Sequence, residues 1–250
     1  MRRTLFTWRG VRFHAYPTLL YLGLVLGVFV GHDAARASGL DADRATTVTL
    51  LLIAPALAGA RLFYVLLHWR LYRRHRRRVW RGQEGGAAMY GGLLLVLALS
   101  VPLTWAFGLR WGAFWDAGML TILTGMIPTR FGCLLNGCCG GRPSAGRLAV
   151  PLPNLRGEWQ HRLPLQLFEA GWAAVLLAGL VAMWPVRPFE GAIFLAGAAG
   201  YGAARLVFEP LREETDRVGP VRVHSAISAG LVMASVCLLA ALWPVPAPAG

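Results

Sequence analysis

Seven apolar runs, each close to the length that crosses a lipid bilayer, constrain the fold of this 250-residue chain more than any other feature. A transmembrane helix needs about 20 mostly apolar residues, with a range of about 17–25. Hydrophobic residues make up 56% of the chain and charged residues only 15%, too little polar surface to cover a soluble globule of this size. We therefore expect an all-α polytopic membrane protein of about seven transmembrane helices. The runs lie near residues 15–31, 46–68, 87–107, 113–128, 166–184, 190–208 and 224–243.

The connections suggest one transmembrane domain over residues 1–243. The longest polar connection, near 140–165, is rich in proline and should form a small extramembrane cap. Residues 244–250 should form a disordered tail. The first run follows a basic start, but no small-residue cleavage site leads into a soluble domain, so we expect a retained helix.

The net charge of +13 comes from arginine alone, since the chain contains no lysine. Such a charge is also typical of nucleic-acid binding. Here the arginines gather in loops between apolar runs, so we expect them to meet the phosphates of membrane lipids and expect no nucleic-acid partner. The amino terminus and the 69–86, 140–165 and 209–223 loops fall on one side of a seven-span arrangement, which the positive-inside tendency would place in the cytoplasm.

The stretch Arg130–Pro143, with the sequence RFGCLLNGCCGGRP, follows the short fourth run directly. An arginine at membrane depth needs an anionic partner. Glycines such as Gly137 let the backbone turn or approach a ligand, and Asn136 offers both a donor and an acceptor. We expect non-helical backbone here, covered by protein or lining a cavity. The stretch predicts a site for a phosphate-bearing ligand.

A second polar set lies on the sixth run. Tyr201, Arg205, Glu209 and Arg212 are spaced four, four and three residues apart, so a helix places them in one narrow stripe. The simplest alternative is an ion pair between Arg205 and Glu209 that only makes the helix tolerable in lipid. A second membrane-level guanidinium beside Arg130 favours phosphate recognition instead.

Several weaker candidates remain. Arg61 either lines the same cavity or extends its head group to the membrane interface. Tyr90 precedes two glycines that allow close approach, although a lone tyrosine is more often an interfacial anchor. Gln166 and Glu169 open the fifth span and either cap the helix or orient an arginine. Tyr16, at the start of the first run, is a further candidate for substrate binding.

Four cysteines give little support to a disulfide framework in a chain of this length. Cys237 lies in an apolar run and should be a small buried hydrophobe. Cys133, Cys138 and Cys139 are close in sequence, but no second cysteine pair or neighbouring histidine follows at zinc spacing. We therefore expect no metal site.

Taken together, these motifs resemble the phosphatidylglycerol–prolipoprotein diacylglyceryl transferase family of bacterial inner membranes, whose members have seven spans. The most specific part is Arg-x-Gly-x-x-x-Asn-Gly, at Arg130, Gly132, Asn136 and Gly137. The resemblance covers nearly the whole chain in the same order, through Gly59–Tyr64, Tyr90–Gly92, Asp116, Arg130–Pro143, Pro164–Glu169, Gly200–Arg205, Glu209 and Arg212.

The resemblance implies transfer of the diacylglyceryl group of phosphatidylglycerol to the lipobox cysteine of prolipoproteins, forming a thioether and releasing glycerol phosphate without a metal or soluble cofactor. It implies that Arg130 and Arg205 hold the phosphate and stabilise the leaving group. Tyr201 would orient Arg205 or donate to the phosphate. The headgroup pocket would be shaped by Asn136 and Gly137, with a guanidinium fixed by Glu209.

This chain departs from the family pattern at three positions. Tyr90 stands where a histidine is common, Cys138 where an acidic residue is common, and Leu163 where another histidine is common. A tyrosine, with a reference pKa of about 10, is a poor base near neutrality, although nearby arginines would lower that pKa. His161, two residues before Leu163, is a candidate to compensate for the missing histidine.

Family members also place the amino terminus and the cap outside the cytoplasm, the reverse of the arginine rule. We adopt the family arrangement, because transfer must occur where exported precursors present their cysteine. The main alternative function is a phospholipid-binding or lipid-translocating protein without catalysis. A small-solute transporter is a third, against which stands the lack of an evident internal repeat.

Overall fold

The computed structural model describes residues 4–73, 89–154, 156–213, 217–218 and 221–243. Within these ranges, six helices are long and apolar enough to cross a membrane, and Tyr90–Ala106 is a shorter apolar helix. These findings confirm an all-α polytopic membrane protein. The six long helices and the shorter α4 are α1 (Ala15–Ala37), α2 (Ala42–Leu67), α4 (Met89–Ala106), α5 (Trp111–Asn136), α6 (Leu165–Met183), α7 (Ala192–Phe208) and α8 (Val223–Leu242).

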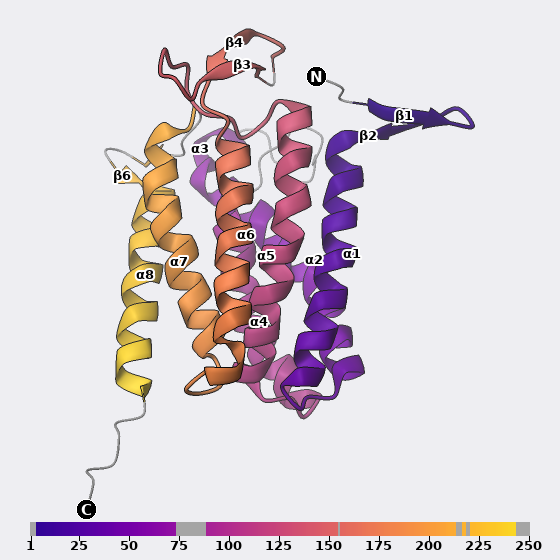
Figure 1. Cartoon of the computed structure of the whole chain (residues 1–250), viewed down its shortest axis with the longest axis vertical. Helices are drawn as coiled ribbons and strands as arrows, with labels where there is room; N and C mark the ends of the chain where they lie inside the picture. The colour runs from indigo at the N-terminus through magenta and orange to yellow at the C-terminus, as the bar shows by residue number, and fades with distance from the viewer. Residues whose placement is uncertain (1–3, 74–88, 155, 214–216, 219–220, 244–250) are drawn as a thin grey trace, which may run out of the picture.

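Short elements gather at one end of the bundle (Figure 1). They comprise three two-stranded antiparallel hairpins, the four-residue helix α3 and the 3-10 turn η4, while the 3-10 turn η3 follows α6 at the other end. The predicted tail and most of the predicted 69–86 loop lie outside the described residues. The short elements are β1 (Thr4–Trp8), β2 (Val11–His14), α3 (Trp69–Tyr72), β3 (Val150–Pro153), β4 (Trp159–Arg162), η3 (Trp184–Val186), η4 (Glu209–Leu211), β5 (Arg217–Val218) and β6 (Val221–Arg222).

Small residues allow α1 to lie directly against α5. A Cβ added at Gly23 would lie 2.4 Å from the carbonyl oxygen of Gly125, and one at Gly27 would lie 2.5 Å from that of Thr121. Glycines four residues apart form one flat strip on a helix, and backbone-to-backbone approach of this kind is typical of helix pairs in membranes. This contact holds the middle of α1 against the middle of α5.

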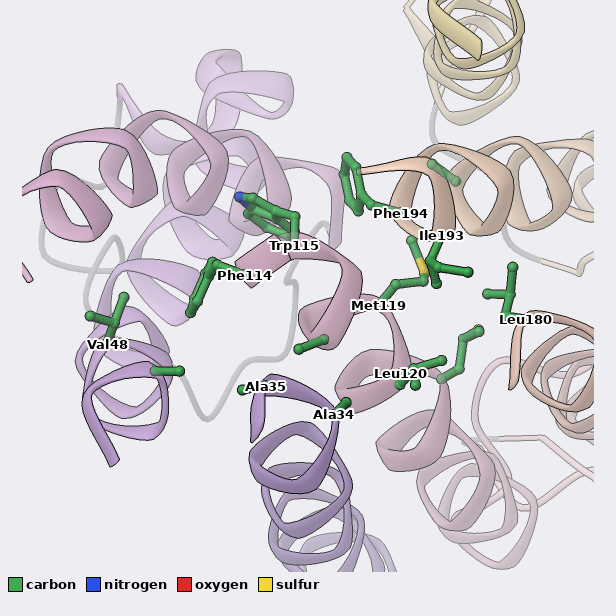
Figure 2. Packing of buried hydrophobic residues seen from close by; sticks show 14 of the residues in the cluster. Ala34, Ala35, Val48, Phe114, Trp115, Met119, Leu120, Leu180, Ile193 and Phe194 are labelled. Atoms are coloured by element: carbon green, nitrogen blue, oxygen red, sulfur yellow. The ribbon is translucent and has the colours of Figure 1, made fainter. Parts of the chain in front are cut away.

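The buried apolar core surrounds α5 (Figure 2). The rings of Trp115 and Phe194 have centroids 4.8 Å apart, which joins α5 to α7. The buried carboxylate of Asp116 accepts hydrogen bonds from the backbone amides of Gly191 and Phe194, at 2.8 and 2.9 Å. A carboxylate there satisfies amides that the first turn of a helix leaves without partners. Asp116 thus fixes the start of α7 against α5.

One expectation about the glycine-rich stretch was wrong. Arg130 to Asn136 is not irregular backbone but the end of the continuous helix α5. In an apolar environment a helix provides hydrogen-bond partners for its own peptide groups. The free energy gained in this way outweighs the low helix propensity of Gly132. The chain turns only at Gly137, whose φ of 78° is left-handed.

Candidate active site

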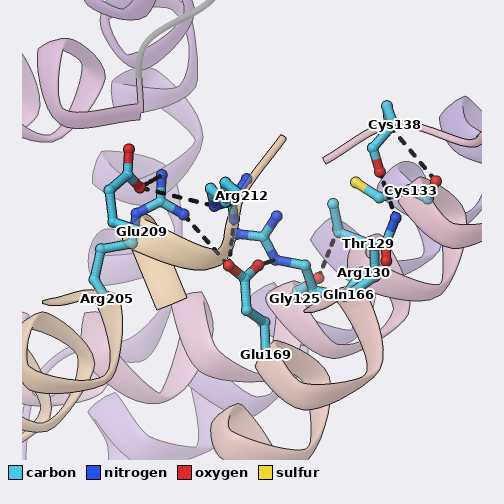
Figure 3. A network of polar contacts seen from close by, with 10 residues as sticks. All are labelled: Gly125, Thr129, Arg130, Cys133, Cys138, Gln166, Glu169, Arg205, Glu209 and Arg212. Carbon is cyan, nitrogen blue, oxygen red and sulfur yellow. Dashed lines mark hydrogen bonds and ion pairs between the residues drawn. The ribbon is translucent and has the colours of Figure 1, made fainter. Parts of the chain in front are cut away.

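Three arginines converge on one buried carboxylate, that of Glu169 in α6 (Figure 3). The Nε atom of Arg130 lies 2.7 Å from Oε2 of Glu169. The Nη1 atom of Arg205 lies 3.3 Å from Oε1, and Nη2 of Arg212 contacts the same oxygen. Glu169 is only 5% exposed, so a strong interaction with cations offsets the cost of burying its charge.

Glu209 is the second carboxylate of this cluster. Its Oε2 lies 2.9 Å from Nη2 of Arg205 and 3.8 Å from Nε of Arg212. The predicted stripe is therefore present, although α7 ends at Phe208 and η4 carries the chain on to Arg212. Burial by itself lowers the pKa of Arg212, but attraction to Glu169 outweighs it and raises that pKa, so Arg212 is charged.

The five side chains carry an excess of positive charge. Three guanidinium charges and two carboxylate charges leave a net charge of +1 among side chains that are at most 11% exposed. Uncompensated charge in a low-dielectric environment is costly, and an anion brought to it is bound strongly. Guanidinium groups are suited to phosphate, because their donors match phosphate oxygens in pairs. The arginine cluster, defined as Arg130, Glu169, Arg205, Glu209 and Arg212, thus has the charge and the donor groups that an anion could bind.

Backbone contacts fix the loop after α5 against this cluster. A Cβ at Gly137 would lie 3.1 Å from the carbonyl oxygens of Pro153 and Asn154, and its φ of 78° is one that other residues rarely adopt, so glycine favours this approach to the end of β3. Gly141 pairs with Arg212 as an isolated β-bridge. The side chain of Gln166 donates to the carbonyl oxygen of Cys138 at 2.7 Å. Gln166 lies one helical turn before Glu169, so the loop and the arginine cluster share α6 as their support.

Tyr90 forms a separate buried group between α4 and α8. Its hydroxyl lies 2.5 Å from Oγ of Ser228, and Oγ of Ser228 donates to the carbonyl oxygen of His224 at 2.7 Å. Since a serine hydroxyl has one hydrogen, Tyr90 is the donor to Ser228. The rings of Tyr90 and His224 have centroids 5.6 Å apart. Tyr90 therefore keeps its proton in this arrangement.

An apolar cavity of about 410 Å³ leads toward the arginine cluster. It lies between α2 and α4 on one side and α5, α7 and α8 on the other, and Tyr201 and Met126 are among its lining residues. The same two residues also line a hollow of about 10 Å³ with Glu169 and Arg205. The volume of the larger, apolar cavity is within the range of about 300–1,000 Å³ that ligand pockets span. Tyr201 thus stands between an apolar chamber and the charged groups.

The other predicted residues occupy the same end of the bundle. Asn136 ends α5, and Tyr16 in α1 lies beside Gly132, where an added Cβ would be 3.3 Å from the Cα of Tyr16. The guanidinium of Arg61 lies over the rings of Tyr64 and Tyr72, at 5.9 and 5.5 Å from their centroids.

The suggestion that His161 replaces a missing histidine is not supported by its position. His161 is exposed on β4, whereas the next residue, Arg162, is only 2% exposed. Adjacent strand residues point to opposite faces, so His161 points away from the side on which Arg162 is buried. Arg162 forms an ion pair with Glu213, with Nη1 2.7 Å from Oε2. This pair, in which Arg162 is buried and Glu213 is exposed, joins β4 to the segment after η4.

The sequence predicted that Glu169 either caps α6 or orients an arginine, and the structure places it against three arginines. The contact of Tyr90 with Ser228 and His224 was not predicted. Both residues lie more than 130 positions from Tyr90 in the sequence, and no local pattern joins positions that far apart.

The motif pattern agrees with comparisons to known proteins. Residues 3–241 match the family model described as prolipoprotein diacylglyceryl transferase. The relatives include proteins named phosphatidylglycerol–prolipoprotein diacylglyceryl transferase from Streptococcus pyogenes serotypes M3 and M5. Each is 26% identical over 226 residues, covering 88% of this chain and 87% of the relative. Because the family model spans nearly the whole chain, this protein belongs to the prolipoprotein diacylglyceryl transferase family.

Proposed function

We propose that this protein transfers the diacylglyceryl group of phosphatidylglycerol to the lipobox cysteine of prolipoproteins in the bacterial inner membrane. One observation carries the proposal: a buried arginine cluster of net charge +1 adjoins an apolar cavity inside a bundle of membrane-spanning helices. A phospholipid has the matching form, an anionic phosphate attached to apolar chains. The printed names of the relatives supply the reaction.

The arginine cluster would act on the phosphate. Arg130 and Arg205, already oriented by Glu169, would donate to the phosphate oxygens of the bound lipid. Attack of the acceptor sulfur on the glyceryl carbon forms a carbon–sulfur bond and breaks the carbon–oxygen bond to phosphate. The bonding electron pair leaves with the oxygen of glycerol phosphate, whose charge the guanidinium groups stabilise. A well-placed donor at such a position contributes about 3–4 kcal/mol.

The apolar cavity would hold acyl chains of the lipid. Its lining is almost wholly aliphatic and aromatic, and Tyr201 stands at the side where the charged groups begin. Tyr201 is thus suited to donate to the phosphate or to an ester oxygen at the boundary. The headgroup glycerol would lie toward Asn136 and Gly137, near Tyr16 at the start of α1.

The decisive test is an assay with purified protein in micelles that contain phosphatidylglycerol and a synthetic lipobox peptide. We expect release of glycerol phosphate together with a peptide heavier by one diacylglyceryl group. A peptide with serine in place of cysteine should give neither product. Binding of phosphatidylglycerol without any release would instead favour the lipid-binding alternative. Tyr90 is consistent with that alternative, because a protein that only binds lipid needs no base to activate a thiol.

We predict that Tyr90→His retains or increases transferase turnover. Imidazole has a reference pKa of about 6.5 and accepts a proton near neutrality, which a phenol with a pKa of about 10 does not. The measurement is the initial rate of glycerol phosphate release. Tyr90→Phe, which only removes the hydroxyl bonded to Ser228, is the matched control and should not exceed the unmodified protein. Complete loss of activity in Tyr90→His would argue against a position facing the reacting thiol.

Narrowing the apolar cavity should weaken lipid use. Ala56 lines the cavity, and phenylalanine there would occupy part of the space proposed for acyl chains. We expect Ala56→Phe to raise the KM for phosphatidylglycerol several-fold and to shift preference toward shorter chains. Ala58→Phe, on the exposed side of the same helix, is the matched control. Equal kinetics for the two variants would remove the cavity from the proposal.

The site end of the bundle should face away from the cytoplasm. Cys139 is exposed in the connection between α5 and β3, at that end. In a Cys237→Ser background, a membrane-impermeant maleimide added to intact spheroplasts should label the protein, and Cys139→Ser should abolish most of that labelling. Labelling only after the membrane is opened would establish the orientation that the arginine rule favours.

A further inference from the structure

Three cysteine thiols come together at the end of α5. Cys133 is buried in the last turn of that helix, Cys138 is half-buried, and Cys139 is exposed in the loop that follows. The Sγ atoms of all three lie within 4.8 Å of one another, and all three are reduced in the structure. The reaction steps proposed above use none of them. A count of cysteines gave little support for a disulfide, because a count does not show which thiols a turn brings together.

The backbone separation of Cys133 and Cys138 permits a disulfide. The amide of Cys138 donates to the carbonyl oxygen of Cys133 at 3.1 Å, across the turn that Gly137 makes with a φ of 78°. With standard bond lengths, this hydrogen bond keeps the two Cα atoms within about 7 Å, and the bend of the turn shortens that separation. Disulfides join cysteines whose Cα atoms are about 4.4–6.8 Å apart. Rotation of the two side chains can therefore bring their sulfur atoms together while the turn stays folded.

Cys139 is better placed to start the oxidation than to remain in the product. It is the exposed thiol of the three. Hydrogen bonds from the two neighbouring thiols lower the pKa of Cys139, and attraction to Arg130 and Arg212 lowers it further, which favours its thiolate. The thiolate is the attacking species in thiol–disulfide exchange, and a thiol of low pKa is also the better leaving group. Cys139 is thus suited both to react first and to be released last.

We propose that Cys133 and Cys138 form a disulfide, and that Cys139 is the thiol through which a disulfide-bearing oxidant reacts. The thiolate of Cys139 attacks the disulfide of the oxidant, which forms a mixed disulfide and releases one sulfur of the oxidant. Cys133 then attacks the sulfur of Cys139 and releases the second. Finally, Cys138 attacks the sulfur of Cys133 and releases Cys139. Two thiols are oxidised, and their two electrons and two protons end on the sulfurs of the oxidant.

This inference rests on the proposed function through its orientation, which places the turn outside the cytoplasm, where disulfides form and persist. The disulfide ties the last turn of α5, one turn after Arg130, to the loop. Gln166 holds the same loop by donating to the carbonyl oxygen of Cys138 at 2.7 Å (Figure 3). A disulfide carries no charge, so the net charge of +1 in the arginine cluster is unchanged. It therefore stabilises the loop beside the proposed phosphate site without weakening the attraction for an anion.

The disulfide is tested by differential labelling of the full-length protein. Protein from cells quenched with acid is denatured and labelled with one maleimide, then reduced and labelled with a heavier one. Peptide mass spectrometry should find the first label on Cys139 and Cys237 and the second on Cys133 and Cys138. Purified, reduced protein treated with glutathione disulfide should give the same pattern. The first label on all four cysteines in either sample overturns the proposal, and so does the second label on Cys139.

Reaction through Cys139 is tested by the rate of oxidation. Cys139→Ser should slow disulfide formation with glutathione disulfide at least ten-fold and still lead to the bond between Cys133 and Cys138. Cys237 is exposed in α8 and not buried as the sequence suggested, and it supplies the matched control. Cys237→Ser should be oxidised at the rate of the unmodified protein. Equal rates for Cys139→Ser and the unmodified protein would refute the role of Cys139.

The effect on the loop is tested by stability. Oxidation should raise the midpoint of thermal unfolding in detergent, because a disulfide restricts the unfolded chain. Cys133→Ser and Cys138→Ser should each unfold at the same midpoint with and without glutathione disulfide. Equal midpoints for the oxidised and reduced unmodified protein would overturn the stabilisation. None of these measurements needs phosphatidylglycerol, so a protein without transferase activity would leave the disulfide standing, and a protein without the disulfide would leave the transferase standing.

Discussion

Arg130→Ala should lower glycerol phosphate release from phosphatidylglycerol by a factor of about 100 or more. Removal of one preorganised donor to a developing negative charge costs about 10²–10³ in turnover. The loss should fall mainly on kcat, because the charge on the leaving oxygen grows as the carbon–oxygen bond breaks. Arg130→Lys should recover only part of the rate, since an ammonium group cannot donate in parallel to two oxygens.

The protein should tolerate this change well enough to be purified. Without Arg130 the cluster has two guanidinium and two carboxylate charges, so no net charge is left buried. Arg110→Ala is the matched control: Arg110 pairs with Glu190 at 2.6 Å, but both side chains are more than a third exposed at the opposite end of the bundle. A normal rate in folded Arg130→Ala would refute the proposed clamp on the phosphate.

Glu169→Ala should have the largest effect on stability. Its loss leaves three guanidinium groups around one carboxylate, a net charge of +2 in buried surroundings. Breaking a buried ion pair by removing one partner typically costs about 3–5 kcal/mol. We expect a drop in the midpoint of thermal unfolding in detergent, measured by the fluorescence of the native tryptophans, and no transferase activity.

Two variants make this result interpretable. Glu190→Ala breaks the exposed pair with Arg110, and exposed pairs contribute only about 0–1 kcal/mol. Its unfolding midpoint should therefore stay close to that of the unmodified protein. Added phosphate should raise the midpoint of Glu169→Ala more than that of Glu190→Ala, because the bound anion replaces the missing charge. Equal midpoints for Glu169→Ala and Glu190→Ala would mean that Glu169 does not organise the cluster.

The 3.6-residue period of a helix was enough to predict that the polar side chains of α7 lie on one face. Arg205 and Glu209 are four residues apart, and the structure joins them at 2.9 Å. A different local signal misled at Arg130 to Asn136. The glycines there suggested irregular backbone, whereas the structure has helix. Helix propensity is a small effect of about 1 kcal/mol for glycine, while an unsatisfied peptide group in an apolar environment costs several times as much.

By itself, the sequence determined the class of this protein, the approximate number of its spans and the side chains that share a face of one helix. These properties depend on residues near one another along the chain, through apolar length and the 3.6-residue period. Only the tertiary structure decided that Glu169 contacts Arg130, Arg205 and Arg212, that Tyr90 donates to Ser228, and that the thiols on the two sides of Gly137 come together. Such contacts depend on how helices pack and where a turn directs the chain, and no local pattern encodes the partner of a charge on another helix.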